Sequence, residues 1–548
     1  MLEDFKKIFL AFSRAERAIF VFAALLVVLC SSTLFAFWIQ KSTKIVPTSG
    51  GELTEGIVGQ PTHLNPIIAT SETDKAIIRL VFNNLTDLAE KIEASKDGRT
   101  WKVRLKEKLV WQDGEKLTSD DVIFTVQKIQ DPESQSPFSS AWQGVLATRL
   151  SELELQFVLA NPYAFFSYNL DGLFVVPKHL LDDVAPANWR LSEYNLKPVG
   201  SGPYAFDSYK ARPDGFIEIY RLKTNQRYAA DHPFIETMNF QFYSDATELI
   251  KGFNLGQIDT IAGLNADDMK EIKRPNKSFS FRLPRYYAVF LNQSKNLALK
   301  ERDVRMALAL AIDKPQLATE ILGGRGVAVD GPIPPGANYS NTEDSASSLE
   351  LANQTLERAG WKLNAEGFRE KTLKNSTIPL EINLVVPQIT FLVKTANMLR
   401  SSWEKIGFKV NIISQSPDEV ANNIIKNRDY EALLFGNILS RSSDLFSFWH
   451  SSERFYPGLN LSLYSNKKVD SLIAASRQNL DAEERRKQFD DLQATIANDY
   501  PAIFLYSPDY LYLAAKNLNG PEPGLLAEPA DRLKNANHWY LKTARVFK

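Results

Sequence analysis

The sequence has a single cysteine, Cys30, so one chain cannot form a disulfide or a zinc or iron–sulfur site built from several cysteines. Its five histidines form no HxH or HxxxH pair, and we therefore expect no metal site and no cofactor. A basic excess is also missing, because 64 Lys and Arg face 65 Asp and Glu, which argues against a nucleic-acid partner. What remains is a chain of 548 residues, 44% of them hydrophobic, which is a composition typical of several globular domains.

One long hydrophobic run is present near the start of the chain. Residues 18–39 (AIFVFAALLVVLCSSTLFAFWI) contain no charge, and about 20 apolar residues are enough for a helix to span a bilayer. Four basic residues precede this run and two follow it closely, so the positive-inside rule places the N-terminus in the cytoplasm. The run predicts a cytoplasmic stub (residues 1–17), a single transmembrane anchor (18–39) in the cell membrane and a large extracytoplasmic remainder.

Two alternatives to a retained anchor stay open. The first is a cleaved signal peptide, for which Ser31, Ser32 and Thr33 offer small residues, although the apolar run exceeds the usual length of about 7–15 residues. The second is lipidation of Cys30, but Leu29 stands where a small residue normally precedes a lipidated cysteine.

The exterior part alternates between strand and helix patterns. Residues 381–412 contain a strand, a helix face with apolar spacings of four and three, and a second strand, which together predict a parallel β-α-β unit. Residues 100–106 alternate apolar and basic side chains as a half-buried strand does, and Thr118 with Asp121 is typical of a capped helix start. These patterns predict an α/β fold.

Motifs for chemistry are missing from the exterior part. The chain has no GxSxG nucleophile elbow and no HExxH motif, and its only cysteine lies in the hydrophobic run. The glycine-rich loop 197–206 (KPVGSGPYAF) lacks the framing of a phosphate-binding loop, so we interpret it as a rigid crossover. We therefore predict that the protein is not an enzyme, with an anchored extracytoplasmic enzyme as a disfavoured alternative.

Taken in order, the motifs resemble those of the family 5 solute-binding proteins of ABC importers, which include oligopeptide, dipeptide and nickel binders. The resemblance covers roughly residues 52–520. It is carried by DGRTWKVRLK (97–106), WQDG (111–114), LTSDDVIFT (117–125), PTHLNP (61–66), GSGPY (200–204), GQID (256–259), RMALALAID (305–313), AGW (359–361) and the segment from Asn460 to Asp470.

The resemblance implies a two-lobe periplasmic-binding-protein-like clamp of type II, with an extra subdomain inserted in lobe I. Such proteins close over a ligand in an interlobe cleft by hinge motion. Hinge crossings are expected near 281–283 and 498–502. Carried onto this chain, the parts are lobe I (47–83, 197–280 and 503–548), the inserted subdomain (84–196) and lobe II (281–502).

On the lobe II side, the family's peptide binders fix the amino end of the ligand with an aspartate in a segment that corresponds here to 435–449. Asp444 is the only carboxylate of that segment, and it either pairs with a ligand ammonium or caps the apolar turn that follows. Arg441 either neutralises Asp444, binds an anionic group of the ligand or faces solvent. Asn437, which replaces the usual tryptophan, and Ser440 complete the predicted lobe II contacts.

On the lobe I side, Thr62 and His63 match positions that line the cleft in the family. The alternative for His63 is a structural histidine whose ring nitrogens are satisfied within the fold.

The resemblance implies a membrane-anchored receptor that captures peptides, or a similar small solute, and delivers them to the permease subunits of an ABC importer. An alternative of the same fold is a sensor that passes ligand occupancy to a partner protein.

Overall fold

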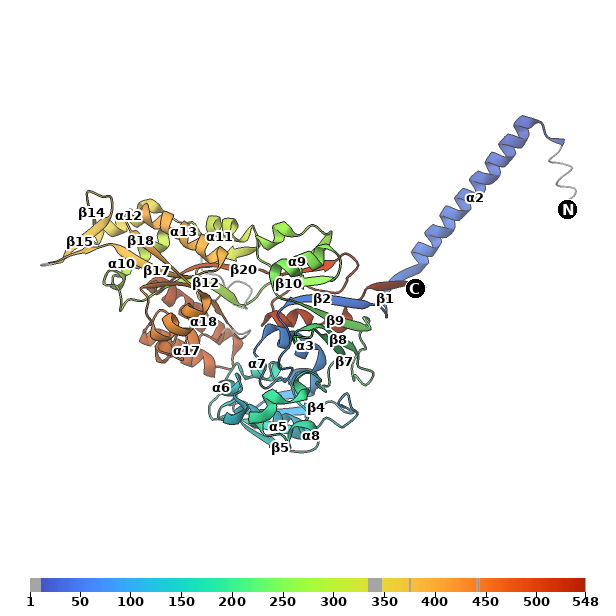
Figure 1. The fold of residues 1–548 in the computed structure, drawn as a ribbon, viewed down its shortest axis with the longest axis horizontal. Helices are drawn as coiled ribbons and strands as arrows, with labels where there is room; N and C mark the ends of the chain where they lie inside the picture. The colour runs from blue at the N-terminus through green and yellow to red at the C-terminus, as the bar shows by residue number, and fades with distance from the viewer. Residues whose placement is uncertain (1–10, 334–346, 374–375, 440–441, 443, 548) are drawn as a thin grey trace.

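The computed structural model describes residues 11–333, 347–373, 376–439, 442 and 444–547. Its most separate element is helix α2 (Arg14–Ser42), which stands apart from the rest of the molecule (Figure 1). None of its residues is buried, and it is the one helix in the described part of the chain that is long and apolar enough to cross a membrane. Ser13 caps its N-terminus through a reciprocal capping box with Glu16.

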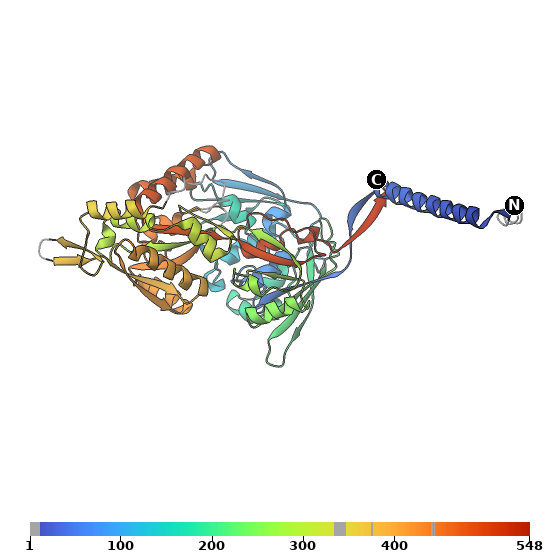
Figure 2. The same cartoon turned by 90° about the horizontal axis from the view of Figure 1, so that it is seen from above.

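A two-stranded ribbon joins α2 to the main body. Strand β1 (Thr43–Thr48) follows α2 directly and pairs antiparallel with β22 (Lys542–Phe547), the last described strand of the chain. The chain therefore returns to the helix at its end, as Figures 1 and 2 both show.

Lobe I, as we use the term, is the seven-stranded sheet next to the ribbon with its helices. Strands β2 and β9 are parallel neighbours at its centre, with β10 parallel to β2 on the other side. Helix α3 (Glu72–Val81) covers one face and α9 (Ala246–Asn254) the other. The strands, in spatial order, are β11 (Asn276–Phe281), β21 (Tyr510–Ala515), β10 (Thr260–Ala262), β2 (Glu52–Val58), β9 (Thr237–Tyr243), β8 (Ile217–Thr224) and β7 (Tyr204–Ala211).

Lobe II is the six-stranded sheet with its helices. One face packs on α10 (Arg302–Leu310), α11 (Lys314–Leu322), α12 (Leu349–Arg358) and α13 (Thr390–Glu404). The other packs on α16 (Phe446–Trp449), α17 (Lys467–Gln478) and α18 (Ala482–Asp499). The strands, in spatial order, are β13 (Gly326–Ala328), β20 (Ala502–Pro508), β12 (Arg285–Leu291), β19 (Ala432–Ile438), β17 (Glu381–Pro387) and β18 (Lys409–Gln415).

The predicted β-α-β unit is confirmed, because β17, α13 and β18 follow one another and the two strands pair in parallel. A small sheet of β14 (Lys362–Leu363), β15 (Arg369–Leu373) and β16 (Ser376–Pro379) projects from this lobe (Figure 1).

The inserted region, residues 84–196, folds around a four-stranded sheet with its own buried core. Helix α5 (Ser119–Gln130) begins with the predicted capping box between Thr118 and Asp121, and its apolar face packs in that core. The strands, in spatial order, are β3 (Ala89–Ala94), β4 (Thr100–Leu105), β6 (Glu154–Val158) and β5 (Leu146–Arg149).

The glycine-rich loop 197–206 approaches the backbone at the C-terminal end of α3 in lobe I. A Cβ at Gly200 would lie 2.0 Å from the carbonyl oxygen of Val81, and one at Gly202 would lie 2.6 Å from that of Leu80. Any larger residue would therefore clash with main chain, so these glycines serve packing.

The chain crosses between the two large sheets twice, and the second crossing differs from the prediction. The first lies between β11 and β12, at residues 282–284, close to the predicted 281–283. Strand β20 pairs with β12 and β13 in lobe II, so the second crossing lies at Asp509, after β20 rather than at 498–502. The apolar run 502–515 supplies a strand to each sheet, and the single residue Asp509 separates the two strands.

Candidate functional site

Asp444 lies where lobe II meets the inserted region. Its Oδ1 accepts a hydrogen bond of 3.0 Å from the amide of Phe446, the first residue of α16, whose N-cap position is Leu445. Its Oδ2 accepts 2.9 Å from the hydroxyl of Tyr163 and lies 3.1 Å from Nε of Arg477. Asp444 is therefore already paired, by an arginine of α17 and by a tyrosine of the inserted region.

The guanidinium of Arg477 lies between two aromatic rings as well as beside Asp444. Its central carbon is 5.1 Å from the centroid of the Tyr163 ring and 4.3 Å from that of Phe446. Burial, and then the neighbouring Asp444 carboxylate, raise the pKa of Tyr163 well above its ordinary value, so its hydroxyl stays protonated and donates.

The inserted region is docked on lobe II at this point. The amide of Ala164 donates 2.7 Å to the carbonyl of Arg477. The next residue, Phe165, is 1% exposed and belongs to the hydrophobic cluster of lobe II, where its ring lies 6.1 Å from that of Phe489. Phe166 points the other way, into the core of the inserted region itself. Phe165 thus packs in the core of lobe II, whereas the adjacent Phe166 packs in the core of the inserted region.

Arg285, the first residue of β12, lies beside both crossings between the large sheets. Its guanidinium donates a hydrogen bond of 3.2 Å to the backbone carbonyl of Asp509, at the second crossing, and its buried Nε has no hydrogen-bond partner among the described residues. Burial lowers the pKa of this guanidinium. Arg285 is half-buried, and among the described residues it makes no ion pair, so its guanidinium can meet an anionic group that enters between the sheets.

Sequence reasoning missed Arg285, although one signal was available. The strand RYYAVFL contains no charge other than this arginine at its first position. Its register partner, Ile438 at the end of β19, is 60% exposed and lies within the predicted ligand segment 435–449.

The lobe I residues Thr62 and His63 lie together in the loop after β2. The Thr62 amide and hydroxyl both donate to the carboxylate of the buried Asp74, at 2.7 and 2.9 Å, and Nδ1 of His63 lies 3.1 Å from the Thr62 hydroxyl. Among the described residues, no hydrogen bond or ion pair joins either of them to Asp444.

Of the three remaining predicted contacts, only Asn437 lies in the described part of the chain. Asn437 is 5% exposed, and its amide donates 3.0 Å to the hydroxyl of Tyr286 within the lobe II core. Ser440 and Arg441 lie outside the described residues.

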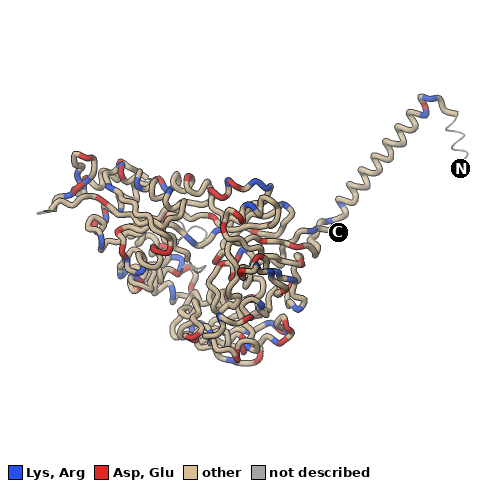
Figure 3. Tube along the Cα trace, viewed as in Figure 1, with Lys and Arg blue, Asp and Glu red and all other residues tan. Residues whose placement is uncertain are grey.

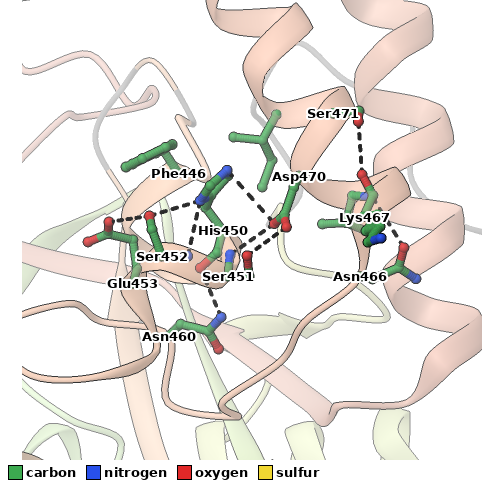
Figure 4. Close-up of polar contacts among 12 residues, drawn as sticks. Phe446, His450, Ser451, Ser452, Glu453, Asn460, Asn466, Lys467, Asp470 and Ser471 are labelled. Atoms are coloured by element: carbon green, nitrogen blue, oxygen red, sulfur yellow. Dashed lines mark hydrogen bonds and ion pairs between the residues drawn. The ribbon is translucent and has the colours of Figure 1, made fainter.

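A serine–histidine–aspartate grouping beside this segment resembles a nucleophilic triad at first sight (Figure 4). Nδ1 of His450 lies 2.9 Å from the Ser452 hydroxyl, but its Nε2 is 3.9 Å from Asp470, beyond hydrogen-bond distance. Asp470 instead accepts from the amide and hydroxyl of Ser451, at 2.9 and 2.6 Å. The network ties α17 to the short helix η7 (Ser451–Arg454), which is a structural role.

Comparison with known proteins places this geometry in a family. The model of the bacterial extracellular solute-binding proteins, family 5 (middle region), matches residues 85–455. The oligopeptide-binding protein AppA of Bacillus subtilis is 27% identical over 93% of this chain and 95% of its own length. The dipeptide-binding protein of Escherichia coli is 24% identical over 82% of this chain and 87% of its own.

Solved structures give the same result. The structure of B. subtilis AppA in complex with a nonapeptide has a TM-score of 0.70 at 26% identity and covers 91% of this chain and 100% of that one. The ABC transporter substrate-binding protein CtaP of Listeria monocytogenes has a TM-score of 0.77 at 22% identity, over 90% of this chain and 100% of its own. The likeness to CtaP shows the fold alone. The predicted two-lobe α/β clamp is thereby confirmed.

Proposed function

Because the chain belongs to the bacterial extracellular solute-binding proteins of family 5, we propose that it is the membrane-anchored receptor of an ABC importer and captures peptides or a similar small solute. The observation that carries the proposal is the family match over 85–455, on a fold of two sheets connected by two crossings. The relatives named above bind oligopeptides and dipeptides, which supports a peptide ligand here.

The receptor works by changing the equilibrium between an open and a closed arrangement of its lobes. A ligand shifts that equilibrium only through its greater affinity for the closed form. We place the hinge at residues 282–284 and at Asp509, where the chain passes between the sheets. The closed form then docks on the permease, and the receptor itself performs no chemistry.

In this proposal, Asp444 and Arg285 determine which charged groups of a ligand the protein binds. A ligand ammonium reaches Asp444 by displacing Arg477, so this aspartate selects amines less strongly than an unpaired one. A ligand carboxylate pairs with Arg285, whose guanidinium makes no ion pair with the residues that the structure describes. Thr62, His63, Ser440 and Arg441 remain predicted ligand contacts.

The proposed topology has residues 1–17 in the cytoplasm and both lobes outside. It is supported by the apolar helix α2 and by the excess of basic residues before it.

The test is recovery of the ligand that accompanies the purified full chain. Native mass spectrometry in detergent should release a bound solute, and peptides should raise the melting temperature. The matched variant Arg285→Met should lose affinity for peptides with a free carboxyl end and keep affinity for amidated ones. A protein that no peptide pool stabilises, and that carries no peptide, would refute the peptide ligand.

A further inference from the structure

The ribbon of β1 and β22 brings the last described residues of the chain back to the end of α2. The register pairs Thr43 with Phe547, so the membrane-side end of the ribbon contains both. The Phe547 ring lies 6.2 Å from that of Trp38 on α2, and Nη1 of Arg545 lies 3.2 Å from the Thr43 hydroxyl. Helix and ribbon are thus in direct contact (Figure 2).

Large apolar side chains at this contact are exposed. Phe547 is 69% exposed, Ile45 61% and Trp38 54%. Exposed aromatic rings next to a transmembrane run are typical of the water–lipid interface, where an aromatic ring is favoured at the level of the headgroups.

Charge on the ribbon has one sign. Residues 17–51 and 532–548 contain no Asp or Glu, whereas Lys41, Lys44 and Arg545 lie in sequence or register next to the contact and Lys542 lies at the other end of the ribbon. Figure 3 shows the uncharged length of α2 with basic positions where it meets the ribbon. Basic residues next to a membrane are attracted to anionic lipid headgroups.

The length of α2 sets the depth of the ribbon. The uncharged run 18–39 spans about 33 Å as a helix, close to the hydrocarbon thickness of about 30 Å. Thr43 lies about 6 Å of helix rise beyond Ile39, and the polar layer on each side of the hydrocarbon is about 5–8 Å thick. The paired residues Thr43 and Phe547 therefore fall within the headgroup layer.

We propose that the membrane-side half of the ribbon, residues 43–45 and 545–547, is a second membrane contact that inserts into the headgroup layer. Trp38 lies at the hydrocarbon edge and Phe547 beside it in the headgroup layer, while Lys44 and Arg545 bind anionic lipid headgroups. This rests on the membrane anchoring by α2 in the proposed function.

Spin-label depth measurement on the full chain in nanodiscs tests the proposal. Cys30→Ser removes the only cysteine, so single labels follow at Val546 and Thr543, with Leu26 as bilayer reference and Leu191, which is 86% exposed, as water reference. The measured quantity is the ratio of the label's accessibility to oxygen to its accessibility to a water-soluble nickel complex. This ratio should be highest for a label at residue 26, lower at 546, lower again at 543 and lowest at 191. Equal values at 546 and 191, with 26 in the bilayer, would overturn the proposal. An aqueous value at 26 would overturn the anchoring itself.

Reversing the charge of Lys44 and Arg545 tests whether these residues bind anionic headgroups or only lie near the membrane. With the label at 546, Lys44→Glu together with Arg545→Glu should move the label towards water in nanodiscs containing phosphatidylglycerol. The same variant should cause no shift in pure phosphatidylcholine. An unchanged depth in both lipids would refute the binding of anionic headgroups.

Discussion

Replacing Phe165 with alanine tests whether the inserted region holds lobe II in place. The side chain is 1% exposed and fills the hydrophobic cluster of lobe II, although its backbone belongs to the inserted region. Full burial of a phenylalanine stabilises by about 2–3 kcal/mol. Because tenfold in an equilibrium constant corresponds to about 1.4 kcal/mol, we expect the ratio of docked to undocked protein to fall roughly 30- to 150-fold.

The adjacent Phe166 provides a matched control. It is equally buried, but it packs in the core of the inserted region itself, so Phe166→Ala should lower stability without releasing lobe II. The distance between spin labels at Leu191 and Leu363, on the two bodies, is the direct measurement. Phe165→Ala should add a population at longer distance in unliganded protein, and Phe166→Ala should not. If both variants lower the melting temperature equally and neither changes the distances, Phe165 is not a docking residue.

Four further predictions follow from individual contacts. Glu55→Gln should lower the free energy of unfolding by about 3–5 kcal/mol in denaturant titration, because it leaves the buried Arg532 without its counter-charge. Gly200→Ala should lower the melting temperature sharply, whereas Ala at Gly215, which has no neighbour within 4 Å, should have only the modest cost of its positive φ. Arg285→Met should raise the unfolding free energy of unliganded protein by about 1 kcal/mol and weaken ligand binding in calorimetry. A double-mutant cycle of Tyr163→Phe and Asp444→Asn should give a coupling energy of about 0.5–1.5 kcal/mol, and additivity would contradict the hydrogen bond.

Local patterns were sufficient for much of the fold. The β-α-β unit 381–412 and the capping box at Thr118 follow from residues close in sequence, and the structure contains both. The crossing at Asp509 was misplaced because the apolar run 502–515 has the same composition on both sides of it. Short apolar runs rich in aromatic residues favour buried strands, but they do not tell which of two sheets a strand joins.

The contacts at the candidate site were harder to predict from the sequence, because the residues that contact Asp444 lie in distant segments of the chain. Asp444 was identified by its position in a motif, whereas Arg477 and Tyr163 carry no local signal that connects them to it. Asn437 shows that a polar residue in a predicted ligand segment can also have a partner within the core, because its amide donates to the hydroxyl of Tyr286.

The two strands of the ribbon have a consequence for how the receptor meets a membrane partner. A body on one flexible strand would sample all orientations and would lose that rotational freedom on every encounter. Here both β1 and β22 lead to lobe I, and the contact between Trp38 and Phe547 adds a second restraint to the single covalent link between α2 and β1. With the anchoring by α2 proposed above, lobe I keeps one face towards the bilayer, and in the proposed hinge motion lobe II is the part that moves when the ligand binds. Part of the orientational search that slows protein association is completed before the partner arrives.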